Sequence, residues 1–298
     1  MSFSLSFFPQ PPVAPPLRRA VVPAPGEIVP SPRFPNAYRF GPKIGEGTFS
    51  VVVGCRDRWH RDLAAKVLKP MGTYEAVKSA AEREFAKLET LRHPRVTCLL
   101  DAFEYRDTFF LITERCASSL AEILPRLGRS ALAWVIPVAE GVLEALDYLH
   151  SQNYSHQDLH LANVFASVPS HWVGPVDPRT VEFKIGDFGV AKMFHELGPA
   201  NTRAQWMLPP EVSDPKFGSV DYRIDIYHAG LLLLQVAYGK ELRFSAAEIL
   251  EGKPRALALR LPPPFALAIE RSLRRHVPAR TASAIEFLDQ LRNAHERL

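Results

Sequence analysis

The most informative part of the chain is His156-Gln157-Asp158-Leu159-His160-Leu161-Ala162-Asn163, followed downstream by Asp187-Phe188-Gly189. A carboxylate five residues before an asparagine, with a second aspartate further on, supplies hard oxygen ligands for Mg²⁺ and a candidate general base. Polar residues of an ordinary solvated loop do not explain three such groups at these offsets. We therefore take Asp158, Asn163 and Asp187 as the chemical centre and work outward from them.

Two further signals lie upstream. Gly45-Glu46-Gly47-Thr48-Phe49-Ser50-Val51-Val52 falls at a predicted strand–turn–strand, where glycines let backbone amides approach phosphate oxygens. On the next predicted strand, Ala64-Ala65-Lys66 places a lysine among apolar residues, and a buried ammonium needs a partner. Glu84, on the amphipathic helix that follows, is the natural candidate. Taken singly, these signals also fit a plain hairpin turn and an outward-facing lysine.

Downstream, three more polar residues stand out. Pro209-Pro210-Glu211 is followed by Asp225 at the head of an apolar helix, and Arg280 comes near the end. An aspartate heading a buried helix is costly unless backbone amides satisfy it. Alone, it would be a helix cap.

The composition predicts an α+β protein with a separate N-terminal arm. Ten of the 27 prolines fall within residues 1–36, so we expect a disordered or extended arm there and a folded domain over residues 37–298. Strand patterns dominate the first third of the domain and helical patterns the remainder, which predicts two lobes with a cleft between them. The expected strands are 38–44, 51–55, 63–68 and 109–113, and the expected helices are 75–91, 131–151, 222–238, 264–274 and 282–294.

Bulk properties exclude several classes of protein. The 36 basic and 32 acidic residues are nearly balanced and form no long basic run, so we expect no nucleic-acid partner. The three cysteines are widely spaced without a zinc-type pattern, as in a reducing compartment. The start lacks the basic region of a signal peptide, and the longest apolar run, residues 229–238, is about half a membrane span. We expect a cytoplasmic protein with no membrane segment.

The arm also contains a minimal polyproline motif, Pro12-Val13-Ala14-Pro15. Residues 9–16 could therefore bind a polyproline-reading domain. Leu17 stands where one common class of these ligands needs a basic residue, and a chance match in a proline-rich arm is the competing explanation.

In order and spacing, the motifs quoted above resemble the signature set of eukaryotic-type (Hanks-type) protein kinases of the serine/threonine class, over roughly residues 38–296. The resemblance implies a bilobal fold with a β-rich N-lobe (37–113), a hinge (114–118) and a helical C-lobe (119–298). It also implies ATP and Mg²⁺ as cofactors, and a protein substrate whose serine or threonine hydroxyl receives the γ-phosphate.

The resemblance assigns a role to each matching residue. Asp158 would accept the proton of the substrate hydroxyl, and Lys66 would hold the α- and β-phosphates while paired with Glu84. Asn163 and Asp187 would hold Mg²⁺. The other expected nucleotide contacts are the glycine turn from Gly45 through Ser50, backbone groups of Glu114 and Cys116, Thr113 as gatekeeper, and Val52, Ala64 and Phe165 around adenine. Glu211 would pair with Arg280, and Asp225 would anchor the catalytic loop.

The chain also departs from the kinase pattern. Gln157 replaces the arginine before the catalytic aspartate, so the basic pocket that reads a phosphate on the activation segment lacks a member. His160, which we count among the catalytic residues, stands where serine/threonine kinases usually carry a lysine. The 24 residues from Asn163 to Asp187 are around ten more than usual, with the excess in a predicted surface loop over Ser167–Thr180. Pro209 replaces the alanine of Ala-Pro-Glu.

Two alternatives stay open at this point. One is a small-molecule kinase, because Asp158-Leu159-His160 with Asn163 also resembles the loop of aminoglycoside and choline kinases. The other is a pseudokinase that keeps the fold as a binding module or scaffold. The presence of Lys66 and of all three residues of the chemical centre argues against the second alternative.

Overall fold

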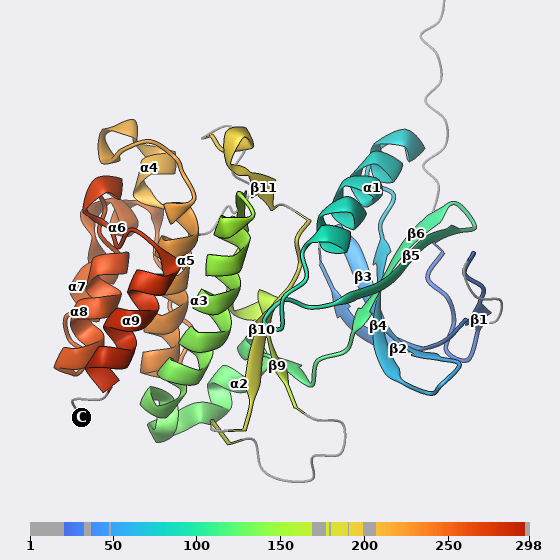
Figure 1. The fold of residues 1–298 in the computed structure, drawn as a ribbon, viewed down its shortest axis with the longest axis horizontal. Coiled ribbons are helices and arrows are strands. Elements are labelled where there is room, and N and C mark those ends of the chain that lie inside the picture. Colours follow the sequence, from blue (N-terminus) through green and yellow to red (C-terminus); the bar gives the residue numbers. More distant parts are fainter. Residues whose placement is uncertain are drawn as a thin grey trace, which may run out of the picture. The chain divides into compact units, whose positions relative to one another are not determined.

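The computed structural model of the chain describes residues 21–32, 37–47, 49–168, 177–178, 180–189, 191–198 and 207–295. The chain divides into two compact units. The first comprises the chain up to Arg83 together with Asp101–Ile112, and the second comprises Glu84–Leu100 and everything from Thr113 onward. The first is rich in strands and the second in helices, which confirms the predicted α+β class (Figure 1).

A six-stranded antiparallel sheet builds the first unit, in the order β1-β2-β3-β4-β6-β5. Its strands are β1 (Ile28–Val29), β2 (Tyr38–Glu46), β3 (Ser50–Asp57), β4 (Asp62–Leu68), β5 (Leu99–Tyr105) and β6 (Thr108–Glu114). Alternate residues of β4 are buried, as expected for a strand with one face on a core. Phenylalanines fill that core: the Phe103 and Phe110 rings stack at 5.3 Å, and Phe40 meets Phe110 edge-on at 5.7 Å.

Part of the expected N-terminal arm belongs to this sheet. Within the described segment 21–32, β1 pairs with the first residues of β2, and Val29 is fully buried in the core. The backbone N–H of Phe40 donates to Glu27 O at 2.8 Å, and that of Gly26 donates to Phe40 O at 2.8 Å. The many prolines of this segment led the sequence analysis to predict no strand here, although the residues that pair lie between the prolines. Residues 1–20 and 33–36 lie outside the described residues.

Helices dominate the second unit. They are α2 (Leu120–Leu127), α3 (Val135–Ser151), α4 (Pro210–Ser213), α5 (Arg223–Tyr238), α6 (Ala246–Glu251), α7 (Lys253–Ala258), α8 (Pro263–Ser272) and α9 (Ala284–His295). Helix α1 (Tyr74–Thr90) begins in the first unit and enters the second at Glu84. Short strands complete the described part of this unit: β7 (Ser118–Ser119), β8 (Tyr154–Ser155), β9 (Val164–Ser167), β10 (Glu182–Ile185) and β11 (Lys192–Met193). They pair as β10-β9-β7 and as β11-β8.

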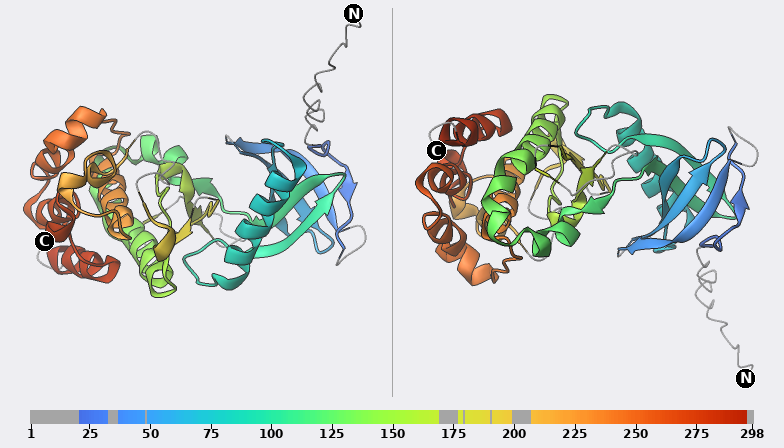
Figure 2. Two further views of the ribbon diagram at one scale, coloured as in Figure 1. Left: turned by 90° about the horizontal axis from the view of Figure 1, so that it is seen from above. Right: turned by 90° about the horizontal axis from the view of Figure 1, so that it is seen from below.

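Helix α3 is the central support of the helical unit. It packs against α5, α9 and strand β10, and these elements lie side by side in the views of Figures 1 and 2. Gly141 makes the contact with β10 close, because a Cβ at this position would lie 2.5 Å from the Cβ and carbonyl oxygen of Phe183. The strand that leads to Asp187 is therefore pressed directly onto α3.

The predicted elements agree with the structure where hydrophobic periodicity was strong. All four predicted strands and all five predicted helices are present, with ends shifted by a few residues. Strands β5, β9 and β10 and helix α2, which contains Pro125, were not predicted. Most of the predicted surface loop over Ser167–Thr180 lies outside the described residues. None of the described helices is long and apolar enough to cross a bilayer.

Candidate active site

The β9–β10 hairpin brings the two expected metal ligands together. Val164 lies opposite Ile185 in this antiparallel pair, and the Gly186 N–H donates to Asn163 O at 3.0 Å just beyond it. Asn163 therefore precedes β9 at the same end of the hairpin at which Asp187 follows β10. An amide oxygen and a carboxylate at this end suit a hard cation such as Mg²⁺.

A single buried carboxylate anchors the loop that carries Asp158. Asp225, with no exposed surface, accepts hydrogen bonds from the backbone N–H groups of His156 (2.9 Å) and Gln157 (2.8 Å). His150 Nε2 approaches the same carboxylate at 2.9 Å. Burial acts to raise the pKa of Asp225, but His150 and the amide donors outweigh it and hold the pKa below its ordinary value. The predicted anchoring role of Asp225 is confirmed.

His156 organises the loop from inside. It is fully buried, its Nδ1 accepts from the Asp158 N–H at 3.3 Å, and its Nε2 lies 3.1 Å from Gly186 O. Since Nδ1 accepts, Nε2 carries a hydrogen and donates to the carbonyl of Gly186. One ring thus connects the backbone of Asp158 to the residue immediately before Asp187.

Asp158 is held as an ionised carboxylate. Its carbonyl accepts from Asn163 Nδ2 at 2.8 Å, and its Oδ2 lies 3.7 Å from His160 Nε2. Burial acts to raise the pKa of Asp158, but His160 beside it outweighs burial and holds the pKa below its ordinary value. The carboxylate is therefore unprotonated at neutral pH and can accept a proton.

Backbone strain marks the same region. Gln157 and Asp187 both have φ of 63°, a left-handed conformation that non-glycine residues seldom adopt. Gln157 is 2% exposed, and among the described residues its Nε2 has no hydrogen-bond partner. Sequence reasoning identified this residue as a departure but gave no indication of its backbone conformation.

The predicted hinge carries an ion pair that the sequence did not reveal. Both oxygens of the Glu114 carboxylate lie within 2.9 Å of Lys184 Nζ on β10, and Oε1 also accepts from the Cys98 N–H at 2.8 Å. Burial, followed by the Glu114 charge, raises the pKa of Cys116 to about 12, so this thiol stays protonated. The 70 residues between Glu114 and Lys184 explain why no local pattern predicts their contact.

In the sheet unit, the expected nucleotide-facing residues share one face. Val52 lies opposite Lys66 in the β3–β4 register, and Ala64 precedes Lys66 by two residues, so the three side chains lie on the same side of the sheet. At the glycine turn, the Gly47 N–H donates to Ser50 O at 2.9 Å. Thr48 lies outside the described residues.

Two lysines hold the glycine turn. Lys69 Nζ donates to Glu46 (2.7 Å) and to the carbonyl of Gly47 (2.7 Å), and Lys43 donates to Glu46 at 2.9 Å. The Lys69 contact, followed by that of Lys43, lowers the pKa of Glu46 to about 2. Glu46 is therefore paired with lysines of its own sheet.

Lys66 and Glu84 belong to different units, Lys66 on β4 and the buried Glu84 on α1. Their pairing stays a prediction, as do the adenine contacts assigned to Thr113, Glu114, Cys116 and Phe165. One contact of α1 was not expected: Lys87 Nζ donates to the carbonyl of Ala191, two residues after Gly189. It fastens the last turn of α1 to the chain that follows Asp187.

Glu211 and Arg280 form the predicted ion pair. Neither side chain has exposed surface, and the two carboxylate oxygens accept from Nη1 at 2.7 Å and Nη2 at 2.8 Å. Arg280 also donates to the carbonyls of Arg223 and Arg274 at 2.9 and 3.1 Å. Every guanidinium nitrogen is thereby engaged.

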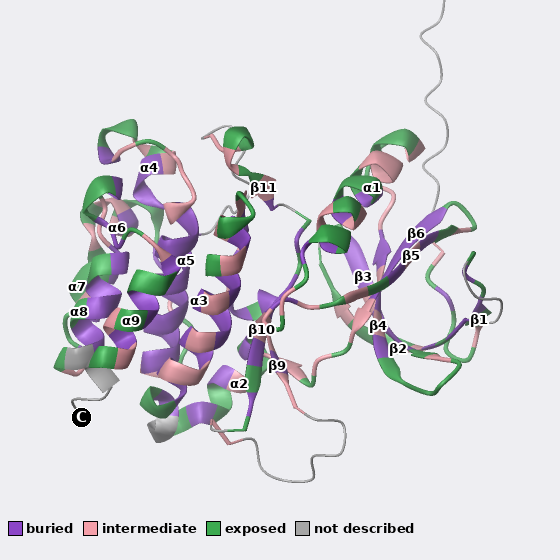
Figure 3. Cartoon of the chain, in the orientation of Figure 1, coloured by how far each residue is buried: buried purple, intermediate pink, exposed green. Residues whose placement is uncertain are grey.

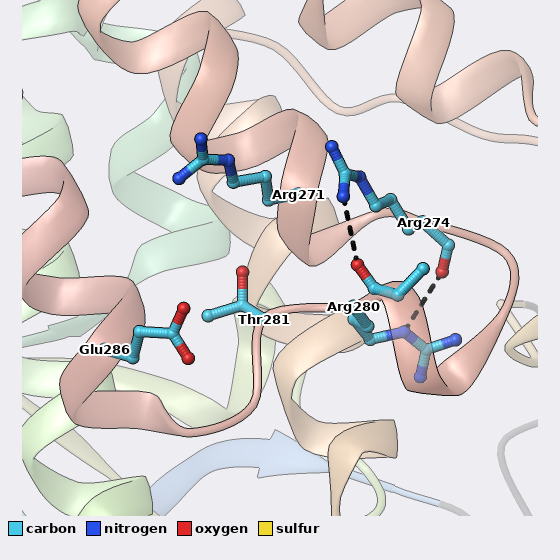
Figure 4. Close-up of a pocket in the computed structure, with 6 residues that line it drawn as sticks. Arg271, Arg274, Arg280, Thr281 and Glu286 are labelled. Carbon is cyan, nitrogen blue, oxygen red and sulfur yellow. Dashed lines mark hydrogen bonds between the residues drawn. The ribbon is translucent and has the colours of Figure 1, made fainter.

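Figure 4 shows the hollow beside this pair, which Arg271, Arg274, Ala279, Arg280, Thr281 and Glu286 line. Arg274 donates to Ala279 O across it, and Arg280 Nε donates to Arg274 O. The second of these bonds holds the guanidinium of Arg280, which also pairs with Glu211. The hollow contains none of the residues expected to contact nucleotide or substrate.

The side chains of Asn163 and Asp187 offer oxygen donors of the kind that suits Mg²⁺. Among the described residues, no three His, Cys, Asp or Glu side chains cluster as a metal site. The Asn163–Asp187 pair offers two oxygen donors, and Mg²⁺ is typically held by one or two carboxylates together with substrate phosphates.

Comparison with known proteins agrees with this geometry. The family described as "Protein kinase domain" matches residues 38–295. Serine/threonine-protein kinase 33 of Bos taurus is 27% identical over 219 residues, which cover 71% of this chain and 44% of the relative. Serine/threonine-protein kinase A-Raf of Homo sapiens is 29% identical over 213 residues, covering 69% of this chain and 33% of the relative.

A plant relative gives the same picture. Serine/threonine-protein kinase ATG1a of Arabidopsis thaliana is 29% identical over 220 residues, covering 70% of this chain and 33% of the relative. The matched region spans less than half the length of each of these relatives. Because the family match covers most of the chain, including all three residues of the chemical centre, this chain belongs to the protein kinase domain family.

Proposed function

We propose that this chain is a serine/threonine protein kinase that transfers the γ-phosphate of Mg-ATP to a hydroxyl group on a protein substrate. The observation that carries the proposal is the placement of Asp158: Asn163 Nδ2 donates to its backbone carbonyl, and the histidine of the same loop bonds Gly186, the residue before Asp187. This arrangement supports Asp158 as the base and Asn163 and Asp187 as the oxygen ligands of Mg²⁺. Its curated relatives are named serine/threonine-protein kinases, which supports this choice of acceptor.

In this mechanism Asp158 accepts the proton of the acceptor hydroxyl. The hydroxyl oxygen forms a bond to the γ-phosphorus, the bond from that phosphorus to the β–γ bridging oxygen breaks, and ADP leaves. His160 Nε2, 3.7 Å from Asp158, orients the carboxylate. Mg²⁺, when bound at Asn163 and Asp187, neutralises phosphate charge.

The remaining residues position ATP. Lys66 binds the α- and β-phosphates and pairs with Glu84, and the amides of the glycine turn from Gly45 to Ser50 approach the phosphates. Backbone groups of Glu114 and Cys116 receive adenine, with Thr113 beside it. Val52, Ala64 and Phe165 enclose the ring, and the shared face of Val52, Ala64 and Lys66 supports this arrangement.

The test is transfer of radiolabelled γ-phosphate to a peptide library containing serine, threonine or tyrosine acceptors. Asp158→Asn should lower kcat by several orders of magnitude, because the base is lost while the shape of the side chain is kept. Asp147→Asn is the matched control, since it makes the same chemical change at an exposed position on α3 and should retain wild-type activity.

Three outcomes would count against the proposal. If Asp158→Asn kept more than about a tenth of wild-type kcat, Asp158 would not be the base. Transfer to a kanamycin-type aminoglycoside or to choline, but to no peptide, would indicate a small-molecule kinase. Nucleotide binding without transfer to any acceptor would indicate a pseudokinase.

Two finer predictions concern partners and location. We propose that residues 9–16, which lie outside the described residues, bind a polyproline-reading domain, and that the protein acts in the cytoplasm. Binding of a synthetic 9–16 peptide to such domains, with Pro12→Ala and Pro15→Ala peptides as controls, tests the first. Equal binding by all three peptides would reject it. Fractionation of cells that produce the full chain tests the second.

A further inference from the structure

Helix α5 is buried along almost its whole length, including three polar side chains. All residues from Ile224 to Ala237 are buried, and Figure 3 shows the helix in the colour of buried residues. The polar members are Asp225, His228 and Gln235. A buried polar group costs free energy unless it forms hydrogen bonds, so each of the three needs a structural explanation. Asp225 holds the catalytic loop, and Gln235 bonds to Leu231 O and the Leu242 N–H.

His228 holds a different segment. Its Nε2 lies 3.2 Å from the carbonyl oxygen of Met207, which is also buried. A hydrogen bond to a carbonyl requires the hydrogen on Nε2, so Nδ1 is an acceptor, and among the described residues Nδ1 has no partner. Burial holds the pKa of His228 below its ordinary value, which keeps the ring neutral at physiological pH.

The segment that His228 holds has few other anchors. It leads from Met207 through Pro209 and Pro210, two residues that have no backbone N–H to donate. Among the described residues, the carbonyls of Pro209 and Pro210 accept local bonds from the N–H groups of Val212 and Asp214. Among the described contacts, this segment is tied to the rest of the helical unit by polar bonds at two points, Met207 to His228 and Glu211 to Arg280.

His228 lies on the same helix as the carboxylate that holds the loop of Asp158. It follows Asp225 by three residues, so both side chains project from one face of α5. One helix face therefore supports the loop that carries Asp158 and, one turn later, the Met207 segment.

We propose that His228 is a positioning residue for the phosphate acceptor. Its Nε2–H fixes the carbonyl of Met207 and thereby sets the segment before Glu211 at a constant position relative to Asp158, where the acceptor hydroxyl must arrive. This inference rests on the proposed kinase function. His228 itself contacts neither nucleotide nor acceptor, so its loss should affect acceptor binding and leave ATP binding intact.

Two substitutions separate the hydrogen bond from the volume of the ring. His228→Leu keeps a similar bulk but removes the donor, which leaves the buried Met207 carbonyl unpaired. His228→Gln supplies an amide N–H at a reach close to that of Nε2. The control is Gln235→Leu, which removes an equally buried polar group from the same helix but breaks bonds to Leu231 and Leu242 instead.

The measurements are the KM for a peptide acceptor, the KM for ATP, and kcat. His228→Leu should raise the KM for the peptide by about tenfold, the effect of one buried carbonyl left without its donor. The KM for ATP should stay within about twofold of wild type. His228→Gln should recover most of the loss, and Gln235→Leu should lower the melting temperature without changing either KM. Equal kinetic defects in His228→Leu and Gln235→Leu would reduce His228 to a structural role and overturn the proposal.

Hydrogen–deuterium exchange gives a readout that does not need activity. Peptides spanning residues 207–214 should exchange faster in His228→Leu than in wild type or His228→Gln, while peptides from α3 stay unchanged. If the wild-type chain phosphorylated nothing, the kinase function would fail, and exchange would still report on the anchor. Unchanged exchange at residues 207–214 in His228→Leu would overturn the positioning role whether or not the chain is a kinase.

Discussion

Replacing Arg280 with methionine should be among the most damaging single changes to the helical unit. Methionine matches the length of the aliphatic part of arginine but has no donors. The substitution removes the two bonds to Glu211 and the bonds to the carbonyls of Arg223 and Arg274. It leaves a carboxylate with no exposed surface and no counter-charge.

The magnitude follows from the burial of the pair. Breaking a buried ion pair by removing one partner costs about 3–5 kcal/mol, because the remaining charge stays desolvated. In a unit of this size, 1 kcal/mol corresponds to roughly 2–4 °C in melting temperature, so we expect a decrease of about 6–20 °C. Arg243→Met is the control. Arg243 pairs with Glu241 at 3.0 Å, but its side chain is 81% exposed, and such a pair contributes only about 0–1 kcal/mol.

Thermal unfolding of the full chain, followed by circular dichroism, checks this expectation. The double variant Glu211→Leu/Arg280→Met tests the cause, since replacing both charges with apolar side chains should recover at least about 2 kcal/mol relative to Arg280→Met. A decrease below about 2 °C for Arg280→Met would refute the reasoning. So would a double variant as unstable as the sum of the two single variants.

Three further predictions follow from described contacts. The pKa of His228 is lowered in the folded chain, so the unfolded chain binds more protons below about pH 6.5. Between pH 7.5 and 5.5, wild type should therefore lose up to about 1.4 kcal/mol more unfolding free energy than His228→Gln, as measured by urea titration. Equal losses in the two proteins would show that His228 is not a buried neutral ring. Lys184→Met removes both contacts to the Glu114 carboxylate and should raise the KM for ATP severalfold. The control Lys216→Met, which breaks an exposed ion pair, should leave that KM unchanged. An unchanged KM for ATP in Lys184→Met would show that the Lys184–Glu114 pair does not support adenine binding. Deletion of residues 1–32 should lower the melting temperature of the sheet unit, whereas deletion of residues 1–20 should leave it unchanged. Equal melting temperatures for the two deletions would show that residues 21–32 do not stabilise the sheet.

Several features of the candidate site could be predicted from the sequence. The offset between Asp158 and Asn163 and the presence of Asp187 predicted a shared site, and the hairpin that follows Asn163 brings these residues together. The pairing of Glu211 with Arg280 across 69 residues was predictable only because the resemblance to the kinase family implied it. Hydrophobic periodicity likewise located the long helices.

Contacts that depend on three-dimensional packing could not be predicted from the sequence. Lys184 and Lys87 look like surface lysines in the sequence, yet one holds the Glu114 carboxylate and the other a backbone carbonyl after Asp187. His228 sits in an apolar run that predicted only burial. Its partner is a carbonyl, and carbonyls carry no sequence signal. The left-handed backbone conformation of Gln157 could not be predicted from the sequence either, since glutamine has no special preference for it.

The pairing of β1 with β2 has a consequence for association between copies of the chain. Strand β2 lies next to the edge of the sheet, and an open edge offers unpaired N–H and C=O groups to other molecules. Residues 26–29 occupy the edge groups of Phe40, while further along β2 the exposed Pro42 has no N–H to donate and Lys43 adds a charge. A chain that begins after residue 36 would expose the Phe40 edge as a template for intermolecular strand addition. Association of such a shortened chain would then increase with protein concentration. The segment 21–32 thus blocks self-assembly at this edge as well as forming part of the fold.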